Sequence, residues 1–321
     1  MFNSLIIILT RKCNKNCSYC NVLKKDENNI WNNISDKKLL EYVKKIIKFV
    51  ELNKLDGIRF FGWEVFLQKE LLKKFINILR KNWFQKDIYV NTNLLLFEKE
   101  DILWIRKYNV KIITSLNWGK KIHCKTRLIS FQEYEILLNN IKNLIDNWVF
   151  MQINMVLFPF DYSILDEFKY IISLAPKKIN LLPLAYSGLL EKYDLYKYKL
   201  NLFKLYLYIK VYNYENNILF YDSKRKNLYT WQRFFPLFTN DPLLDIDGNL
   251  YYSMAVMEKF FDDKRKKLLV GNINVINNMK ISYKKKYGEV IEDTLKQLWK
   301  KYILTIKINK FISLVNLIIN V

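Results

Sequence analysis

The sequence is best read outward from Leu5-Ile6-Ile7-Ile8-Leu9-Thr10-Arg11-Lys12-Cys13-Asn14-Lys15-Asn16-Cys17-Ser18-Tyr19-Cys20, where an apolar run passes into three closely spaced cysteines. The apolar run is short and rich in β-branched residues, which predicts a buried first strand. The cysteines then stand at the carboxyl end of that strand, where βα proteins place their reactive groups. Their C-x3-C-x2-C spacing puts three thiolates on one loop. Three thiolates can bind three irons of a [4Fe–4S] cluster and leave the fourth iron open to a small molecule.

Other readings of Cys13, Cys17 and Cys20 are a zinc site completed by a distant ligand, or three unpaired thiols. Zinc usually takes four ligands arranged in pairs, and the remaining candidates, His123 and Cys124, are adjacent and isolated. A disulfide framework is disfavoured, because a long basic chain without a signal peptide indicates the cytoplasm. Spacing and context together favour the iron–sulfur cluster.

The bulk composition sets limits on the class of protein. A chain of 321 residues that is 51% hydrophobic can bury a sizeable core, in one large domain or two ordinary ones. No apolar run reaches the roughly 18 residues of a membrane span. The net charge of +22 resembles a nucleic-acid signal, but the lysines are scattered and the chain is rich in Asn, Ile, Tyr and Phe. We attribute the high lysine content to the base composition of an AT-rich genome. An acidic peptide or an RNA as the substrate remains an alternative.

Strand-like and helix-like runs alternate over the first ~185 residues, which is the pattern of a parallel α/β sheet. This alternation predicts an α/β fold, a partial (β/α)6 TIM-like barrel that stays open. After strand 5–10, the expected strands are 57–61, 87–91, 110–116, 149–157 and 178–182, and the expected helices are 36–52, 69–82, 101–108, 131–147 and 162–174.

The pattern breaks after this region. A long helix is expected over 193–214, two β-like pieces over 243–253 and 268–273, and a closing helix over 291–302. The Asp247-Gly248 pair between apolar runs is a hairpin signal. We therefore expect two domains, a barrel over 1–186 and a small C-terminal α+β region over 187–321.

With these features the chain resembles the radical SAM superfamily, specifically its SPASM/twitch-type branch. Cys13, Cys17 and Cys20, with Tyr19 before the last cysteine, match the superfamily's cluster motif. The resemblance implies that S-adenosylmethionine binds the open iron. One electron would then cleave its sulfonium, and the resulting 5′-deoxyadenosyl radical would take a hydrogen atom from a substrate. In such enzymes the protein positions and shields the cofactor.

A second stretch, Gly62-Trp63-Glu64-Val65-Phe66-Leu67, is similar to the family's Gly-Gly-Glu-Pro-Leu-Leu. The resemblance implies that this segment, Gly62, Trp63 and Glu64, holds the methionine ammonium of S-adenosylmethionine through a backbone carbonyl and the carboxylate. Trp63 stands at a glycine position of the motif.

A third stretch runs from Ser115 to Phe131 and resembles the branch's Ser-Leu-Asp-Gly…His-Asp-x-x-Arg…Ser-Phe. It implies that Ser115 binds the ribose and that Arg127 pairs with the methionine carboxylate, which suits an arginine fork. Asn93 and Asn154 stand at further positions where the family contacts S-adenosylmethionine. His123 is interpreted as structural rather than as a catalytic base, and Cys124 as a lone thiol.

The C-terminal stretch around Asp247-Gly248-Asn249 looks like the SPASM/twitch hairpin region. That region typically carries cysteines for auxiliary clusters. Here Ser253 occupies such a position, and no cysteine follows Cys124. We therefore expect a single cluster.

The leading hypothesis is a radical SAM enzyme that modifies a peptide or protein, with reduced ferredoxin or flavodoxin as electron donor. We expect it in the cytoplasm without a membrane partner, and nucleic acid is disfavoured as a partner but stays open. One alternative is the same chemistry on a small molecule or an RNA base. Another is a degenerate binding protein that keeps the fold without cleaving S-adenosylmethionine.

Four tryptophans occupy positions where glycine is expected. Trp63 and Trp118 stand at glycine positions of the motifs, and Trp83 and Trp148 each lie between a helix and a strand, where a glycine cap is common. One explanation is a UGA codon that the source organism reads as glycine. The other is drift with tryptophan tolerated.

Overall fold

A computed structural model describes residues 4–20, 29–117, 119–157, 164–183, 195–212, 218–220, 241–252 and 265–281. The strands are β1 (Ser4–Ile8), β2 (Gly57–Phe61), β3 (Asp87–Asn91), β4 (Val110–Ser115), β5 (Met151–Leu157), β6 (Lys178–Pro183), β7 (Ile218–Phe220), β8 (Leu243–Leu244), β9 (Asn249–Tyr251) and β10 (Leu269–Asn272). The helices are α1 (Asp36–Leu52), α2 (Lys69–Lys81), α3 (Asp101–Lys107), α4 (Lys120–Arg127), α5 (Phe131–Asp146), α6 (Ile164–Ser173), α8 (Leu195–Val211) and α10 (Arg265–Leu268), with short 3-10 turns at Val65–Gln68 and Ile276–Asn278.

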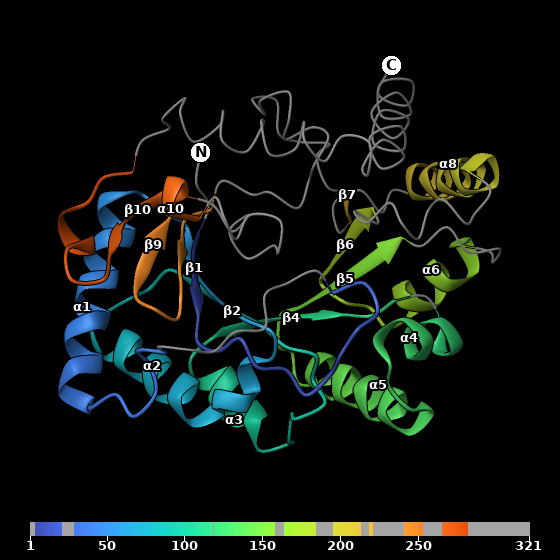
Figure 1. Cartoon of the computed structure of the whole chain (residues 1–321). Coiled ribbons are helices and arrows are strands. Elements are labelled where there is room, and N and C mark those ends of the chain that lie inside the picture. Colours follow the sequence, from blue (N-terminus) through green and yellow to red (C-terminus); the bar gives the residue numbers. More distant parts are fainter. Residues whose placement is uncertain are drawn as a thin grey trace.

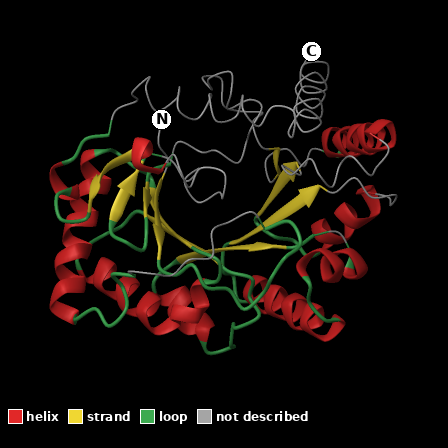
Figure 2. Ribbon diagram, viewed as in Figure 1, coloured by secondary structure: helices red, strands yellow, loops and turns green. Residues whose placement is uncertain are grey.

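All ten strands form one sheet in the order β10-β9-β8-β1-β2-β3-β4-β5-β6-β7. β1 to β7 pair in parallel with their neighbours, and within the described chain the two edges of the sheet do not pair with each other. Figures 1 and 2 show the curved sheet with α1, α2, α3 and α5 along its outer, convex side. The expected α/β fold, an open partial barrel, is confirmed.

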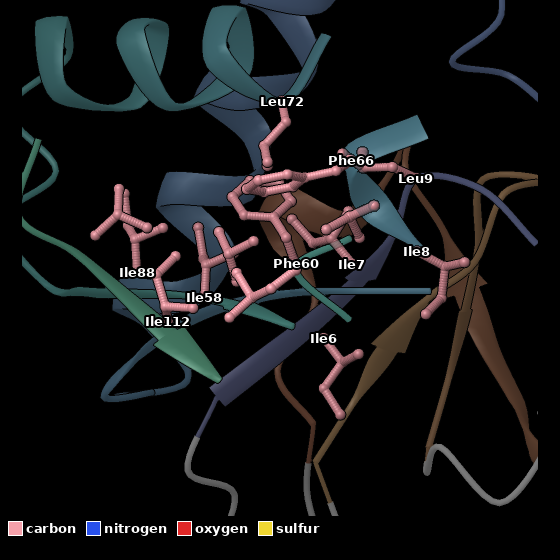
Figure 3. Packing of buried hydrophobic residues seen from close by; sticks show 14 of the residues in the cluster. Ile6, Ile7, Ile8, Leu9, Ile58, Phe60, Phe66, Leu72, Ile88 and Ile112 are labelled. Atoms are coloured by element: carbon pink, nitrogen blue, oxygen red, sulfur yellow. The ribbon is translucent and has the colours of Figure 1, made fainter. Parts of the chain in front are cut away.

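The main core lies between the convex side of the sheet and these helices. In Figure 3, residues from four neighbouring strands gather beneath Leu72 of α2; they are Ile7, Ile58, Phe60, Ile88 and Ile112, all fully buried. Burying such side chains stabilises the fold by about 1.5–3 kcal/mol each. In β2 to β6 the residues between these positions are mostly half-buried, so they face the concave side.

The C-terminal hairpin joins the first strand. β8 pairs in parallel with β1, and β9 and β10 continue the sheet beyond it. Asp245 is fully buried and accepts hydrogen bonds from the guanidinium groups of Arg11 and Arg265. This bridge fixes the base of the cysteine loop to the C-terminal hairpin. The domain boundary near 187 stays a prediction, and the expected helix over 291–302 and Ser253 lie outside the described residues.

Most expected elements agree with the structure to within one or two residues, but α4 was not expected at all. Its sequence is polar and basic, and only Ile122, His123, Cys124 and Thr126 are buried. Such a short helix gains its stability from tertiary packing rather than from intrinsic propensity. β7 was not expected either. None of the helices in the described part has the length and apolar character needed to cross a bilayer.

Candidate functional site

The expected site residues converge on one rim of the barrel. The three cysteines follow β1, Gly62 to Glu64 follow β2, Asn93 follows β3, and Ser115 ends β4. Because the carboxyl ends of parallel strands meet at the same edge, these loops are neighbours in space. Arg127 reaches this rim from the end of α4, while Asn154 lies within β5, opposite Ser115 in the register.

The cysteine loop is anchored on both sides. Ser18 donates its backbone N–H and its hydroxyl to the carbonyl of Thr126, at 2.9 and 3.0 Å. Lys15, between the first two cysteines, forms an ion pair with Glu133 at the start of α5. On the other side, the side chain of Asn93 donates to Asn14 at 2.7 Å. The loop is therefore held to the segments after β3 and β4.

Cys13, Cys17 and Cys20 are half-buried and are not part of a disulfide. Burial raises the pKa of Cys13, against the hydrogen bond that the Lys15 N–H donates to its sulfur. In the part of the chain described, no three His, Cys, Asp or Glu side chains are grouped closely enough to hold one metal ion. Each thiolate of a cubane cluster binds a different iron, so its sulfurs stand further apart than the ligands of a single ion. Three thiols on one short loop are the ligand set that a [4Fe–4S] cluster takes, with its fourth iron left open.

Gly62 lets two loops touch. A Cβ atom there would lie 2.5 Å from the carbonyl oxygen of Thr10, so any side chain would push the cysteine loop away. Its neighbour Trp63 is half-buried, and the indole N–H is buried without a hydrogen-bond partner in the described structure. An orphaned buried donor costs about 1–3 kcal/mol.

Glu64 is fully buried beneath the cysteine loop. Its carboxylate accepts hydrogen bonds from the Thr92 hydroxyl at 2.7 Å, the Phe66 N–H at 3.0 Å and the Asn93 N–H at 2.6 Å. Burial raises the pKa of Glu64, and these donors and the positive charge of Arg127 act in the opposite direction. A cation placed beside this carboxylate would favour its charged form.

Arg127 supplies the complementary charge. Its guanidinium lies 5.8 Å from the centre of the Tyr19 ring, and its Nε is buried without a partner among the described residues. Burial alone would lower the pKa of Arg127, but Tyr19 and the three cysteines together raise it. An arginine with a buried, unused N–H beside the cysteine loop is prepared to receive an anion.

Asn93, Asn154 and Ser115 have different surroundings in the structure. The side chain of Asn93 contacts Asn14 and the N–H of Leu95, which makes it a link between loops in this structure. Asn154 accepts hydrogen bonds from two neighbouring amides, Gln152 at 3.0 Å and Asn180 at 3.2 Å. Ser115 is half-buried beside Asn154 on the concave side.

His123 is fully buried and accepts a hydrogen bond from the N–H of Asn117 through Nδ1, at 3.0 Å. Burial, assisted by the charge of Arg127, lowers the pKa of His123 to about 2, so the ring is neutral at physiological pH. Its geometry agrees with a structural role. The Cys124 thiol faces the carbonyl of Ser130 at 3.5 Å, which agrees with a lone thiol.

Sequence reasoning missed the residues that position the site. Thr92 holds Glu64, while Asn117 contacts both Tyr19 and Thr126, each at 3.1 Å. The only available signal was the Ser130-x-x-Glu133 capping box, which is present and brings Glu133 within reach of Lys15.

Comparisons with known proteins place this geometry in a wider group. A family model described as "Radical SAM superfamily" matches residues 7–168. Among solved structures, native anSMEcpe with bound AdoMet has a TM-score of 0.67 at 17% identity, over 98% of this chain and 99% of that one. The same protein with AdoMet and the Cp18Cys peptide gives 0.66 at 16% identity, over 98% and 99%. Coproporphyrinogen III oxidase (HemN) from Escherichia coli gives 0.47 at 12%, over 93% and 80%. No curated protein matches the chain.

Proposed function

This chain belongs to the radical SAM superfamily, and on that premise we propose that it is an active enzyme that modifies a peptide or protein. The family uses a [4Fe–4S] cluster and S-adenosylmethionine. We assign the cluster to Cys13, Cys17 and Cys20. When bound, this pair of cofactors supplies one-electron cleavage of the sulfonium and removal of a hydrogen atom from the substrate.

The observation that carries the proposal is the pair of opposite charges around the cysteine loop. Arg127 lies close enough to Glu64 for its charge to act against the rise in that carboxyl's pKa, and the Glu64 charge in turn helps to raise the pKa of Cys13. A free amino acid group carries an ammonium and a carboxylate side by side. Glu64 would take the ammonium, and the unused N–H of Arg127 would take the carboxylate. Ser115 and Asn154, neighbours on the concave side, would face the ribose end.

We further assign the chain to the SPASM/twitch-type branch. Support comes from the Asp247-Gly248-Asn249 turn beside β9 and from the full-length likeness in fold to anSMEcpe, which has been solved with a peptide. With no cysteine after Cys124, one cluster would serve the whole reaction. Reduced ferredoxin or flavodoxin in the cytoplasm would deliver the electron.

Anaerobic reconstitution with iron and sulfide, followed by dithionite and S-adenosylmethionine, tests the reaction class. We expect 5′-deoxyadenosine from the native sequence and none from Cys13→Ala. Cys124→Ala is the matched control, because its thiol faces Ser130 rather than the loop, and it should keep full product formation.

A loaded cluster that binds S-adenosylmethionine without cleaving it would overturn the enzyme proposal. That result would favour a degenerate binding protein, which one observation supports, namely the orphaned indole N–H of Trp63 beside the site.

A further inference from the structure

The middle and amino-terminal parts of the central strands carry a second group of charged and aromatic side chains on the concave side. Arg59, Tyr89 and Lys111 are register neighbours on β2, β3 and β4. They alternate with the core residues Ile58 and Phe60 and their counterparts, so they point away from the helices. Nothing in the reaction proposed above uses them.

Cations and aromatic rings interleave in this group. The Lys111 Nζ lies 5.3 Å from the ring centre of Tyr89 and 5.2 Å from that of Phe150. Arg59 lies 5.8 Å from the Tyr89 ring, and Lys178 lies 6.0 Å from the Phe150 ring. We call Arg59, Tyr89, Lys111, Phe150 and Lys178 the floor cluster.

The floor cluster carries more positive than negative charge. Asp87 forms an ion pair with Lys111 at 2.6 Å and accepts a hydrogen bond from the Tyr89 hydroxyl at 2.9 Å. Arg59 has no ion pair within the described residues, and its Nε is buried without a partner. Lys178 has no described anionic partner either. Besides burial, the nearby Asp87 and Asp56 raise the pKa of Tyr89. Neither carboxylate forms an ion pair with Arg59 or Lys178 among the described residues, so these two half-buried cations can still accept an anion.

We propose that the floor cluster binds an acidic segment of a peptide substrate. This proposal rests on the proposed function, and it adds that the peptide substrate is acidic near the residue that is modified. Lys111 lies four residues before Ser115 on β4, which is about 13 Å at about 3.3 Å per strand residue. An extended peptide covers that distance in about four residues. The acidic side chains would therefore lie about three to five positions from the residue that is modified.

The geometry favours a peptide over a nucleic acid. Single-stranded nucleic acids need open aromatic faces on which bases stack. Here Arg59 and Lys111 lie over the Tyr89 ring, and Lys111 and Lys178 lie over the Phe150 ring. Carboxylates can instead bind the outward ends of the same cations.

Fluorescence anisotropy tests this without catalysis, and so independently of the cluster. The probe is fluorescein-Gly-Ala-Gly-Ala-Glu-Glu, and its Gln-Gln analogue with an amidated end is the reference. At 150 mM salt we expect the native sequence to bind the acidic probe roughly tenfold more tightly, about 1.4 kcal/mol. Arg59→Gln and Lys178→Gln, singly and together, should remove this preference. Neither residue has a described polar partner, so both variants should fold.

The matched control is Arg106→Gln with Lys44→Gln, two exposed cations on the outer helices α3 and α1. Equal loss in this control would show binding to the general positive surface and would overturn the proposal. A uridine hexanucleotide whose binding is lost in Arg59→Gln and Lys178→Gln would overturn the peptide assignment. Failure to form 5′-deoxyadenosine would instead leave the binding result standing and reject the proposed reaction.

An independent observation concerns the tryptophans. Trp83 and Trp148 have φ of +61° and +59° and are 84% and 91% exposed. Each follows a helix in the same closed turn, in which the next residue, Phe84 or Val149, donates its N–H to a carbonyl five residues earlier. This is the Schellman turn, whose left-handed position is usually glycine.

Two other tryptophans, one in the core and one packed against it, have partners for their indole N–H. Trp31 is buried and donates its indole N–H to the Ile8 carbonyl at 2.8 Å, and Trp104 donates to Asp101 at 3.0 Å. Trp63 differs from both, because its indole N–H is buried without a described partner.

We infer that positions 63, 83 and 148 are glycine in the native protein, through a UGA codon read as glycine; Trp118, the fourth position of the hypothesis, lies outside the described residues. Sequencing the gene tests this directly, with UGA expected at these three positions and UGG at 31 and 104. UGG at position 63 would overturn the inference for the site. Peptide mass spectrometry of the protein from its source gives the second readout, and tryptophan found at 83 and 148 would reject the inference there.

Discussion

The two faces of the same strands are built differently. On the convex side, alternate residues such as Phe60 of β2 and Ile153 of β5 are fully buried against helices. On the concave side, the alternate positions carry Arg59, Gln152 and Asn180 and are half-buried. Parallel sheets covered on both faces read as continuous apolar runs. Among the described strands of the barrel only β1 is a continuous apolar run that is buried at every position. In β2 to β6, one face packs into the core and the other carries mostly polar, half-buried side chains.

The largest expected effect separates these faces directly. Ile153→Ala should lower the free energy of unfolding by about 2–5 kcal/mol, because it opens a cavity in the core. Gln152→Ala, the next residue on the same strand, should cost less than about 1 kcal/mol. Urea denaturation of both variants measures the difference. Equal losses would show that the concave face also carries the fold.

Gly62 directly follows β2, at the rim where the carboxyl ends of the strands meet. Gly62→Ala places a methyl group 2.5 Å from the Thr10 carbonyl, and we expect a loss of about 1–3 kcal/mol together with poor cluster loading. The measurement is iron and sulfide per chain after reconstitution, alongside a thermal melt. Leu67→Ala, an exposed change in the same segment, should leave loading unchanged. Normal loading of Gly62→Ala would show that the loop tolerates displacement.

His123 of α4, next to the rim, gives a smaller effect that depends on pH. Its folded pKa, about 2, lies below the unfolded value of about 6.5, so only the unfolded chain takes up a proton between them. Its stabilising effect is therefore lost as the pH falls below about 6.5. Between pH 7.5 and pH 5.5, the free energy of unfolding should therefore fall by about 1.4 kcal/mol because of His123. His123→Asn keeps an acceptor for the Asn117 N–H and should lose correspondingly less stability over this range, as measured by urea titration at both pH values.

The smallest expected effect is that of Cys124→Ser. Its thiol lies on the buried side of α4 and faces a carbonyl that a hydroxyl can also reach. We expect unchanged cluster content, unchanged 5′-deoxyadenosine formation and a stability change below about 1 kcal/mol. A drop in iron content would show that the Cys124 thiol contributes to the cluster site, so that the site would not be confined to the residues of the rim.

Periodicity in the sequence predicted the convex face well. The apolar spacing of α1, α2 and α5, and the β-branched run of β1, express burial on one side, which local sequence records directly. The family motifs likewise predicted which loops meet at the rim. Glu64 and Arg127 were expected beside the cysteines and lie there.

Contacts between distant residues could not be predicted. Arg11 and Asp245 are 234 positions apart, and nothing local in either segment indicates their pairing. α4 was missed for a related reason, because its few buried residues gain their partners from other segments. The floor cluster was visible as alternation in β2 to β6, but only the register of the strands shows that the cations lie side by side.

The position of β1 between β2 and β8 also has a consequence for synthesis of the protein. β1, which precedes the cysteine loop, is synthesised before β8 and Asp245, which follow about 180 residues after β2. At about 5–20 residues per second, this delay is roughly 10 to 40 seconds. During that time the nascent chain has the cysteines but not the anchor of Arg11. A cluster delivered during this delay would therefore enter a loosely held loop, and β8 and Asp245, which are made later, would fix the loop in place.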